Sequence, residues 1–478
     1  MKTINFILIL FLPLLAFGQD MPRNVDLGKP NPYPFITSAL LAIDEAGKDN
    51  ATKGIELARS KYMPVNDGKI YVEIVHGAVT DLDKPVDGKA LEARLNIDVT
   101  TTYKNRASAW VEVGRLLDVA RRLPPGHSLN EVVVLAEDNQ GPGLMNSDTY
   151  ATATTGGEGI RIAVIDGNYN GLTAARAAGA VPSLANSTFF NYAGGSFEGG
   201  SSSHGTSCLE TVFDHAPNAE YYIMKVSSFA DLGAAVQDCI NNGVDIISHS
   251  ISRYNTGWDD DTGAACAAAW EASKNGILFF TSAGNRNGTH WQGAFNDPDG
   301  DGWHNWSGTD EGNNFTINGI AGAAGTVQAR LQWNSPSTED HYDLYLYEAG
   351  TNNLLASSTN AGQFESLNYS TTTGQQVYLA VRANTPNPPE FELFNHDARC
   401  TNFQFASTRS STTSPSNSTS PNVISVGALP MADYNQPPGT TGIIAAYSSR
   451  GPTNNGNPAP DLCAPTNTTT TGGAFTGT

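Results

Sequence analysis

The sequence contains few positively charged residues and few cysteines, and both shortages reduce the range of functions it can have. Its 478 residues carry 27 Lys and Arg against 47 Asp and Glu, which gives a formal net charge of −20. Without a basic stripe to neutralise phosphates, nucleic acid is excluded as a partner. The five cysteines follow no metal-ligand or redox spacing. Their odd number leaves at least one thiol without a disulfide partner in the chain.

Long apolar runs are also absent, apart from a short one at the start. Residues 6–17 are apolar, Lys2 supplies a positive charge before them, and Ala16 and Gly18 place small residues at a cleavage point. A membrane anchor or a buried strand is the alternative, but the run is too short to span a bilayer comfortably. We expect a signal peptide over residues 1–18, no membrane anchor, and a secreted or periplasmic protein.

The length predicts two to four domains, and the 39% apolar content is that of a folded protein. In the first of them, residues 70–75, 95–101 and 132–135 have strand patterns. Residues 115–122 form an amphipathic helix that Pro124 and Pro125 stop. This predicts a small α+β domain within residues 24–138.

The next segment alternates strands and helices. Apolar strands are expected at residues 160–165, 220–226, 244–250 and 277–281, with helices at 206–213, 232–241 and 264–274 between them. Such alternation is typical of a parallel sheet with helices on both faces. It predicts an α/β domain that begins at residues 150–285.

After Asn285 the pattern changes to period two. Runs at residues 327–333, 342–348, 375–384 and 391–394 alternate in side-chain character, and no convincing helix occurs before residue 402. This predicts a β-sandwich inserted over residues 286–420. Its last part, residues 407–420, is rich in Ser and Thr and is expected to be a linker. A strand at residues 423–429 then resumes the α/β domain over residues 421–478.

Three polar residues stand at the ends of these elements. Asp166 ends a buried strand, and open α/β sheets build their sites at that edge. His204 starts an apolar helix, where Gly205 allows a close approach of the backbone. Asn285 follows another buried strand, and its amide can donate to an oxyanion. The order of the three along the chain predicts acyl-transfer chemistry.

Taken singly, each residue has an ordinary alternative: an aspartate that ends a strand, a structural histidine, an asparagine in a turn. Only His204 lies in a His-Gly-Thr sequence, and the other histidines near it in the chain are His215, His249, His290 and His304. An esterase fits poorly, because no Gly-x-Ser-x-Gly elbow is present.

With these motifs in this order, the chain resembles the subtilisin-like serine peptidases (subtilases). The shared segments are Val-Ile-Asp-Gly at Asp166, His-Gly-Thr at His204, residues 243–250, Ser-Ala-Gly-Asn at 282–285, and residues 447–452 and 460–465. The resemblance covers residues 155–285 and 421–478. One departure is Gly167-Asn168 after the aspartate, where the family often has Ser-Gly or Thr-Gly.

The resemblance implies hydrolysis of protein or peptide substrates by an Asp/His/Ser triad. His204 would act as general base, Asp166 would orient it, and Asn285 would donate to the oxyanion. Residues 250–252 would pair with an extended substrate peptide. The family's nucleophile is the serine of Gly-Thr-Ser. Since Gly477 and Thr478 are the last two residues, we expect it directly after them.

The flanking domains resemble known modules more loosely. The segment at residues 69–137 has the position and pattern of a subtilase propeptide, which is a folding chaperone and inhibitor; a non-inhibitory accessory domain is the alternative. The insert resembles the pre-peptidase C-terminal sandwich through residues 331–333 and 340–346. It would bind substrate protein or only pack against the rim of the catalytic domain.

Acidic residues alternate at Asp297, Asp299 and Asp301, with Gly302 at the sixth position. This is the first half of a calcium loop. The closing acid is missing at Gly308, so a calcium site and a solvated acidic turn both remain open.

The chemistry requires no other cofactor. The leading hypothesis is a secreted serine endopeptidase, and the alternative is a catalytically inactive binding protein with a subtilase fold. The sequence gives no indication of an oligomeric state.

Overall fold

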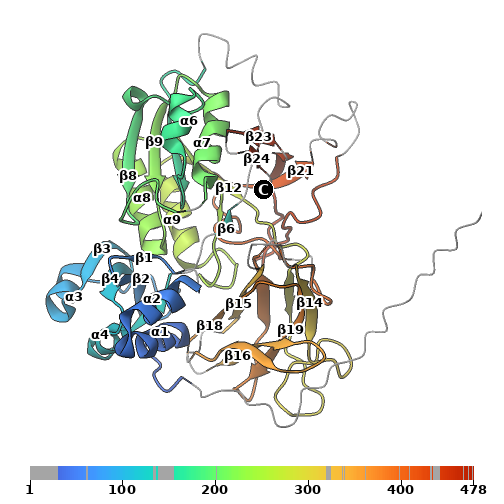
Figure 1. The fold of residues 1–478 in the computed structure, drawn as a ribbon. Helices are drawn as coiled ribbons and strands as arrows, with labels where there is room; N and C mark the ends of the chain where they lie inside the picture. Colours follow the sequence, from blue (N-terminus) through green and yellow to red (C-terminus); the bar gives the residue numbers. More distant parts are fainter. Residues whose placement is uncertain are drawn as a thin grey trace, which may run out of the picture.

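The computed structural model describes residues 31–60, 63–132, 136–137, 156–200, 202–318, 325–335, 337, 340–360, 362–397, 399–407, 410–430, 433, 442–466, 468–471, 473–475 and 477. The expected signal peptide lies outside this set. Figure 1 shows an α/β unit (residues 156–285 and 410–477) above an N-terminal unit (31–132, blue) and a β-rich unit (286–407). Among the described helices, none has the length and apolar character that crossing a membrane requires.

The α/β unit is built on a seven-stranded sheet in which every pairing is parallel. The strand order is β22-β21-β12-β10-β7-β9-β8. The parallel sheet predicted from sequence is therefore confirmed. Its strands are β7 (Arg161–Asp166), β8 (Ser187–Asn191), β9 (Glu220–Lys225), β10 (Ile246–His249), β12 (Leu278–Ser282), β21 (Val423–Pro430) and β22 (Leu462–Thr466).

Helices cover both faces of this sheet, as predicted. Ala163 and Ile165 of β7 face one core with α8 (Phe229–Asn241) and α9 (Gly263–Lys274). Ile162 and Val164 face the opposite core, with α6 (Leu172–Ala177) and α7 (His204–His215). This alternation follows from the two-residue period of a strand. The short 3₁₀ helix η1 (Leu184–Asn186) lies before β8.

The N-terminal unit packs four helices on one face of an antiparallel sheet. The sheet has the order β1-β2-β4-β3, with β5 on the other edge of β2. The strand expected at residues 95–101 begins later than predicted, because Leu95 ends α3 and β3 begins at Asp98. The elements are α1 (Ser38–Asp49), α2 (Ala51–Ser60), β1 (Val65–Asn66), β2 (Lys69–His76), α3 (Gly88–Leu95), β3 (Asp98–Tyr103), β4 (Arg106–Glu112), α4 (Leu116–Arg122) and β5 (His127–Glu131). The strand expected at residues 132–135 lies almost entirely outside the described residues.

The β-rich unit consists of two four-stranded antiparallel sheets around one shared core. The described residues between 286 and 407 contain no helix. The sheets are β13-β20-β15-β18 and β14-β19-β16-β17. Their strands are β13 (His290–Gly293), β14 (Asn313–Ile317), β15 (Gly325–Trp333), β16 (Tyr342–Glu348), β17 (Leu354–Ser358), β18 (Phe364–Thr371), β19 (Gln375–Ala383) and β20 (Phe391–Asn395). The exact domain boundaries stay predictions.

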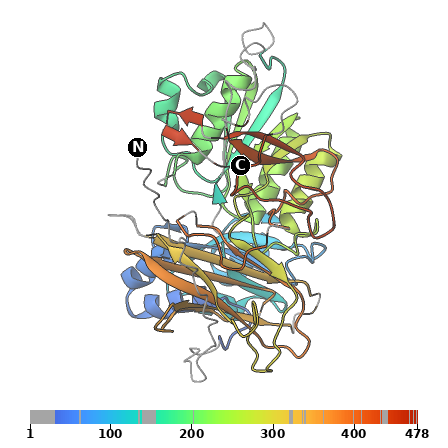
Figure 2. The same ribbon diagram turned by 90° about the vertical axis from the view of Figure 1, so that its right-hand side faces the viewer.

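The outer face of one of these sheets is buried although it is polar. Leu331 of β15 faces the shared core, whereas Arg330 and Gln332 point the other way and are still 1% and 3% exposed. The rest of the molecule covers this face: Tyr254 of the α/β unit packs on Phe394 of β20, with ring centroids 5.2 Å apart. Figure 2 shows the β-rich unit directly beneath the α/β unit.

The Ser/Thr-rich segment, which was expected to be a linker, is largely buried. Residues 410–414 and 416–417 are buried. Ser414 exchanges backbone hydrogen bonds with Arg253, and its hydroxyl donates to Asp259 at 3.0 Å. The hydroxyl of Ser416 pairs with that of Ser425 at 2.6 Å. Small hydroxyl side chains can be buried where they find hydrogen-bond partners, as those of Ser414 and Ser416 do.

Candidate active site

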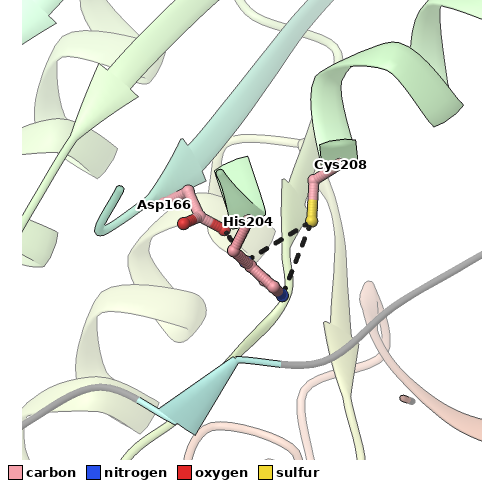
Figure 3. Close-up of side chains that lie close together, drawn as sticks. All are labelled: Asp166, His204 and Cys208. Atoms are coloured by element: carbon pink, nitrogen blue, oxygen red, sulfur yellow. Dashed lines mark hydrogen bonds and ion pairs between the residues drawn. The ribbon is translucent and has the colours of Figure 1, made fainter. Parts of the chain in front are cut away.

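Asp166 and His204 meet at the carboxyl edge of the parallel sheet (Figure 3). Asp166 is the last residue of β7, and His204 is the first residue of α7. The Nδ1 atom of His204 lies 2.7 Å from the Oδ2 atom of Asp166. The two residues are 5% and 0% exposed. The helix expected over residues 206–213 begins at His204 itself, so the histidine lies in its first turn.

Backbone contacts around the pair fix this approach. The amide of Gly205 donates to the carbonyl of Asn168 at 2.7 Å. The amide of Asn168 donates to the Oδ1 atom of Asp166 at 3.2 Å. The second carboxylate oxygen is thereby held while Oδ2 faces the imidazole. The departure from the family at Gly167-Asn168 therefore keeps a turn that orients the aspartate.

Two opposing effects act on the imidazole of His204. Burial lowers its pKa, because a charged ring is costly in a site without water. The neighbouring carboxylate of Asp166, with a further contribution from Cys208, outweighs burial and raises the pKa of His204 well above its usual value. A histidine in this position accepts a proton readily and is stabilised once it is charged.

Cys208 is a third group at this site, which sequence reasoning did not single out. Its Sγ atom lies 3.7 Å from Nδ1 and 3.9 Å from Nε2 of His204. Ligand atoms of Asp166, His204 and Cys208 lie within 4.8 Å of one another, so the three could hold a metal ion. The signal that could have revealed it is spacing, since residues four apart share one face of a helix.

Asn285 lies at the same edge of the sheet. It follows β12, which is two strands from β7 in the sheet order, and it is half-buried. Gly284 before it has a φ of +101°. A Cβ atom there would lie 3.0 Å from the Oγ atom of Ser449 and 3.1 Å from that of Ser252. The Ser-Ala-Gly-Asn sequence thus needs its glycine.

The strand expected to pair with a substrate peptide is already paired within this chain. This strand, β11 (Ile251–Ser252), runs antiparallel to β6 (Ala136–Glu137). Ile251 lies opposite Glu137, and Ser252 lies opposite Ala136. Residues 136–137 follow the N-terminal unit in sequence, so the chain occupies its own predicted peptide-binding strand.

The N-terminal unit is anchored at the start of α8. The carboxylate of Asp231 accepts hydrogen bonds from the hydroxyls of Thr101 at 2.6 Å and Tyr71 at 3.1 Å. Glu73 accepts a longer bond from the amide of Ala230 at 3.4 Å and forms a buried ion pair with Arg106. Negative groups are favourable at a helix N-terminus, where free N–H groups point outward.

The end of the described chain runs beside α7. The hydroxyl of Ser207 lies 2.9 Å from that of Thr470 in β23 (Thr468–Thr470), which pairs with β24 (Gly473–Phe475). Thr471 donates its amide and its hydroxyl to the carboxylate of Glu210. Thr470 and Thr471 are thus held along the helix that begins with His204.

The other histidines have separate environments. The Nδ1 atom of His249 lies 3.1 Å from the hydroxyl of Thr281, and burial lowers the pKa of His249 well below its usual value. Burial likewise lowers the pKa of His290 to about 4 and that of His304 to about 3. Burial also lowers the pKa of His215, at the end of α7. Among the described histidines, the raised pKa belongs to His204.

The three aspartates of the acidic loop come together as the spacing predicted. One carboxylate oxygen from each of Asp297, Asp299 and Asp301 lies within 4.8 Å of the others. Both oxygens of Asp297 accept backbone amides, from Gly300 at 2.7 Å and Gly302 at 2.9 Å. An all-oxygen donor set suits calcium, but Asp299 and Asp301 are exposed. The geometry therefore fits part of a calcium site.

The seven-stranded parallel sheet with helices on both faces is consistent with a subtilisin-like fold. The sequence model of the Subtilase family matches residues 157–478, which is most of the chain. The chain belongs to the subtilase family. No curated protein matches it.

Several solved structures show a weaker likeness. The CspB protease of Clostridium perfringens is 14% identical with a TM-score of 0.40, over 69% of this chain and 82% of that one. The prenylagaramide maturation protease PagA is 22% identical with a TM-score of 0.23, over 31% and 52%. Fervidolysin from Fervidobacterium pennivorans, a keratinolytic enzyme related to subtilisin, is 13% identical with a TM-score of 0.25, over 47% and 41%. Membership of the family rests on the sequence model alone.

Proposed function

We propose that this subtilase is a secreted serine endopeptidase with Asp166 and His204 in its triad. The observation that carries the proposal is the buried 2.7 Å contact between the Nδ1 atom of His204 and the Oδ2 atom of Asp166. A carboxylate on Nδ1 fixes the tautomer in which Nε2 can take a proton, and it stabilises the imidazolium that forms. The proposed nucleophile is the serine that follows Gly477-Thr478 in the family motif.

The proposed reaction is peptide-bond hydrolysis through an acyl-enzyme. His204 takes the hydroxyl proton of the serine as its oxygen attacks the carbonyl carbon, and then gives that proton to the leaving amine. A water molecule hydrolyses the acyl-enzyme by the same route. The side-chain amide of Asn285 is the proposed donor to the oxyanion, which supports the tetrahedral intermediate as charge develops on its oxygen.

The N-terminal unit is proposed to be an inhibitory propeptide. The pairing of residues 136–137 with β11 supports this role, because a substrate peptide would use the same backbone groups. The contacts of Tyr71, Thr101 and Glu73 at the start of α8 would hold the unit in place. Release of this unit would free the strand for substrate.

A calcium ion is proposed as a structural ligand of Asp297, Asp299 and Asp301, bound through carboxylate oxygens at the acidic loop. The gathering of three carboxylates within 4.8 Å supports it. Desolvation and the negative charges of Asp301 and Asp297 raise the pKa of Asp299. A divalent cation would relieve the repulsion between these carboxylates.

The competing proposal is an inactive binding protein that keeps the scaffold and uses its β-rich unit. The two proposals differ in the residue after Thr478, which is a serine in the first.

The deciding assay is hydrolysis of a labelled protein by the full-length gene product. Asp166→Asn should lower kcat/KM by about 10⁴-fold, because the imidazole then loses its orienting carboxylate. His215→Gln, in the same helix as His204, should leave kcat/KM unchanged. A wild-type protein without hydrolytic activity would favour the binding protein.

A further inference from the structure

The buried side-chain amide of Gln332, in the β-rich unit, forms hydrogen bonds with three residues. Its Nε2 atom donates to the Oδ2 atom of Asp259 at 3.0 Å and to the Oε2 atom of Glu392 at 2.7 Å. Its Oε1 atom accepts the backbone amide of Asn255 at 3.1 Å. Glu392 lies directly opposite Gln332 on the neighbouring strand, whereas Asn255 and Asp259 belong to the α/β unit.

Asn255 lies just beyond β11, the strand that pairs with residues 136–137. Its φ is +57°, and that of Asp259 is +50°, so the chain turns sharply at both positions. Asn and Asp adopt such angles more readily than other non-glycine residues, and hydrogen bonds to the segment can fix the turns further. The hydrogen bond from Asn255 to Gln332 and the bond from Gln332 to Asp259 hold both turns.

The opposite side of this segment is held by the Ser/Thr-rich stretch. The Oδ1 atom of Asp259 accepts bonds from the hydroxyl of Ser414 at 3.0 Å and from the side-chain amide of Asn417 at 3.2 Å. Ser414 also pairs with the backbone of Arg253. Residues 253–259 are therefore held between the buried stretch at 410–417 and the β-rich unit, where Gln332, the backbone carbonyl of Glu365 and the ring of Phe394 contact them.

The two carboxyl groups that share the amide are both buried. Desolvation raises the pKa of Glu392 to about 8 and that of Asp259 well above its usual value. Charges of Asp260 and Glu390 act in the same direction. Burial lowers the pKa of His290, whose Nε2 atom lies 3.7 Å from Glu392, to about 4. A neutral donor such as Gln332 can satisfy both groups where a second ionised group would be costly.

We propose that Gln332 is a positioning residue for the peptide-binding strand: it fixes the end of β11 from the β-rich unit. The β-rich unit is then part of the substrate-binding edge and not an appended module. The consequence for catalysis rests on the proposed peptidase function, whereas the effect on β11 is measurable without activity.

The first test is hydrogen–deuterium exchange on the 478-residue chain, with peptide-level mass spectrometry over residues 251–258. Gln332→Met keeps the size of the side chain and removes all three bonds. It should speed exchange in this peptide about tenfold, the equivalent of one net hydrogen bond. The control is Gln328→Met, on the same strand and the same face, which should leave exchange there unchanged. An unchanged rate for Gln332→Met, or a rise that is equal throughout the chain, would overturn the proposal.

A wild-type measurement covers the case in which Gln332→Met does not fold. The amide of Asn255 should exchange as slowly as those of β11, although it lies in a turn. Exchange at the rate of an open loop would contradict the proposal.

The second test uses the full-length gene product and two substrates. For an extended peptide, Gln332→Met should raise KM about tenfold with little change in kcat. A short acyl ester, which does not reach β11, should be hydrolysed at the wild-type rate. Gln332→Glu keeps the acceptor for Asn255 but places a third acid beside Asp259 and Glu392, so it should restore none of the lost affinity. Equal losses on both substrates would refute a positioning role. If the wild type hydrolyses neither substrate, the proposed peptidase function fails, and the exchange experiment still decides the role of Gln332.

Discussion

Gly205 and Asp166 approach so closely that no side chain fits between them. A Cβ atom on Gly205 would lie 2.7 Å from the Cβ atom of Asp166, 2.9 Å from its Cγ atom, and 2.7 Å from the carbonyl oxygen of Asn168. The first turn of α7 can reach the carboxyl end of β7 only because residue 205 is a glycine. The glycine after the histidine thus serves the contact between His204 and Asp166.

Gly205→Ala should therefore separate the helix from the strand. The added methyl group overpacks a buried site, which costs about 1–3 kcal/mol of unfolding free energy. It should also lower hydrolytic activity, since the imidazole moves away from the carboxylate. Urea unfolding and peptide hydrolysis measure the two effects. The control is Gly362→Ala, where a Cβ atom meets no atom within 4 Å. Equal stability of both variants would contradict the account.

The contact between Asp166 and His204 should also appear in the pH dependence of stability. Because the carboxylate raises the pKa of His204 above its unfolded value, the ion pair contributes fully below about pH 6.5. That contribution is lost as the pH rises through the folded pKa. The free-energy gap between wild type and Asp166→Asn should thus be widest near pH 5–6 and shrink in alkaline solution. Urea unfolding over a pH series measures it.

His215 is the internal control for that series. Burial lowers the pKa of His215, whereas that of His204 is raised. The stability of His215→Gln relative to wild type should therefore increase as the pH falls below about 6.5. A gap for Asp166→Asn that stays constant from pH 5 to 9 would argue against a charged imidazole in the folded protein.

Sequence located the sheet, its carboxyl edge and the three candidate residues because each depends on local pattern. Buried parallel strands are continuous apolar runs, and Asp166 and Asn285 simply follow two of them. What sequence missed depends on contacts between distant segments. Nothing in the pattern of β15 itself shows that its polar face is covered, and the Ser/Thr stretch was expected to be a linker. Both are buried because other units cover them.

Cys208 shows the same limit at the site itself. Its place on an apolar helix was clear from sequence, but its distance from His204 depends on where that helix begins. The spacing of four residues puts both side chains on one face of α7, a signal that the sequence contained. The pairing of residues 136–137 with β11 could not be predicted, since so short a strand has no pattern of its own.

The ion pair between Glu73 and Arg106 should carry a large share of the stability of the N-terminal unit. Both side chains are buried, and Glu73→Gln would leave the guanidinium without its countercharge. The expected cost is about 3–5 kcal/mol. The control is Asp81→Asn, which removes an exposed pair with Lys84 and should cost about 0.5 kcal/mol or less. Unfolding monitored within residues 31–132 measures both, and similar small losses would show that the pair is not needed.

Calcium should bind the acidic loop and stabilise the whole chain. Titration calorimetry should show heat for the wild type, and saturation at a hundredfold excess over Kd should add about 2.7 kcal/mol to the unfolding free energy. Asp299→Ala should abolish both effects, whereas Glu56→Gln, at an exposed acid of α2, should keep them. If Asp299→Ala still gives binding heat, calcium binds at another site. If the wild type gives no heat, the loop is a solvated acidic turn and not a calcium site.

The most direct measurement is fluorophosphonate labelling of the full-length gene product, with the modified residue identified by mass spectrometry. The reagent reacts with a serine that a neighbouring base activates, so labelling measures whether His204 and Asp166 together activate the nucleophile. We predict one labelled serine, directly after Gly477-Thr478, and strong loss of labelling in His204→Gln. A label on another serine, or equal labelling in His204→Gln, would contradict the triad.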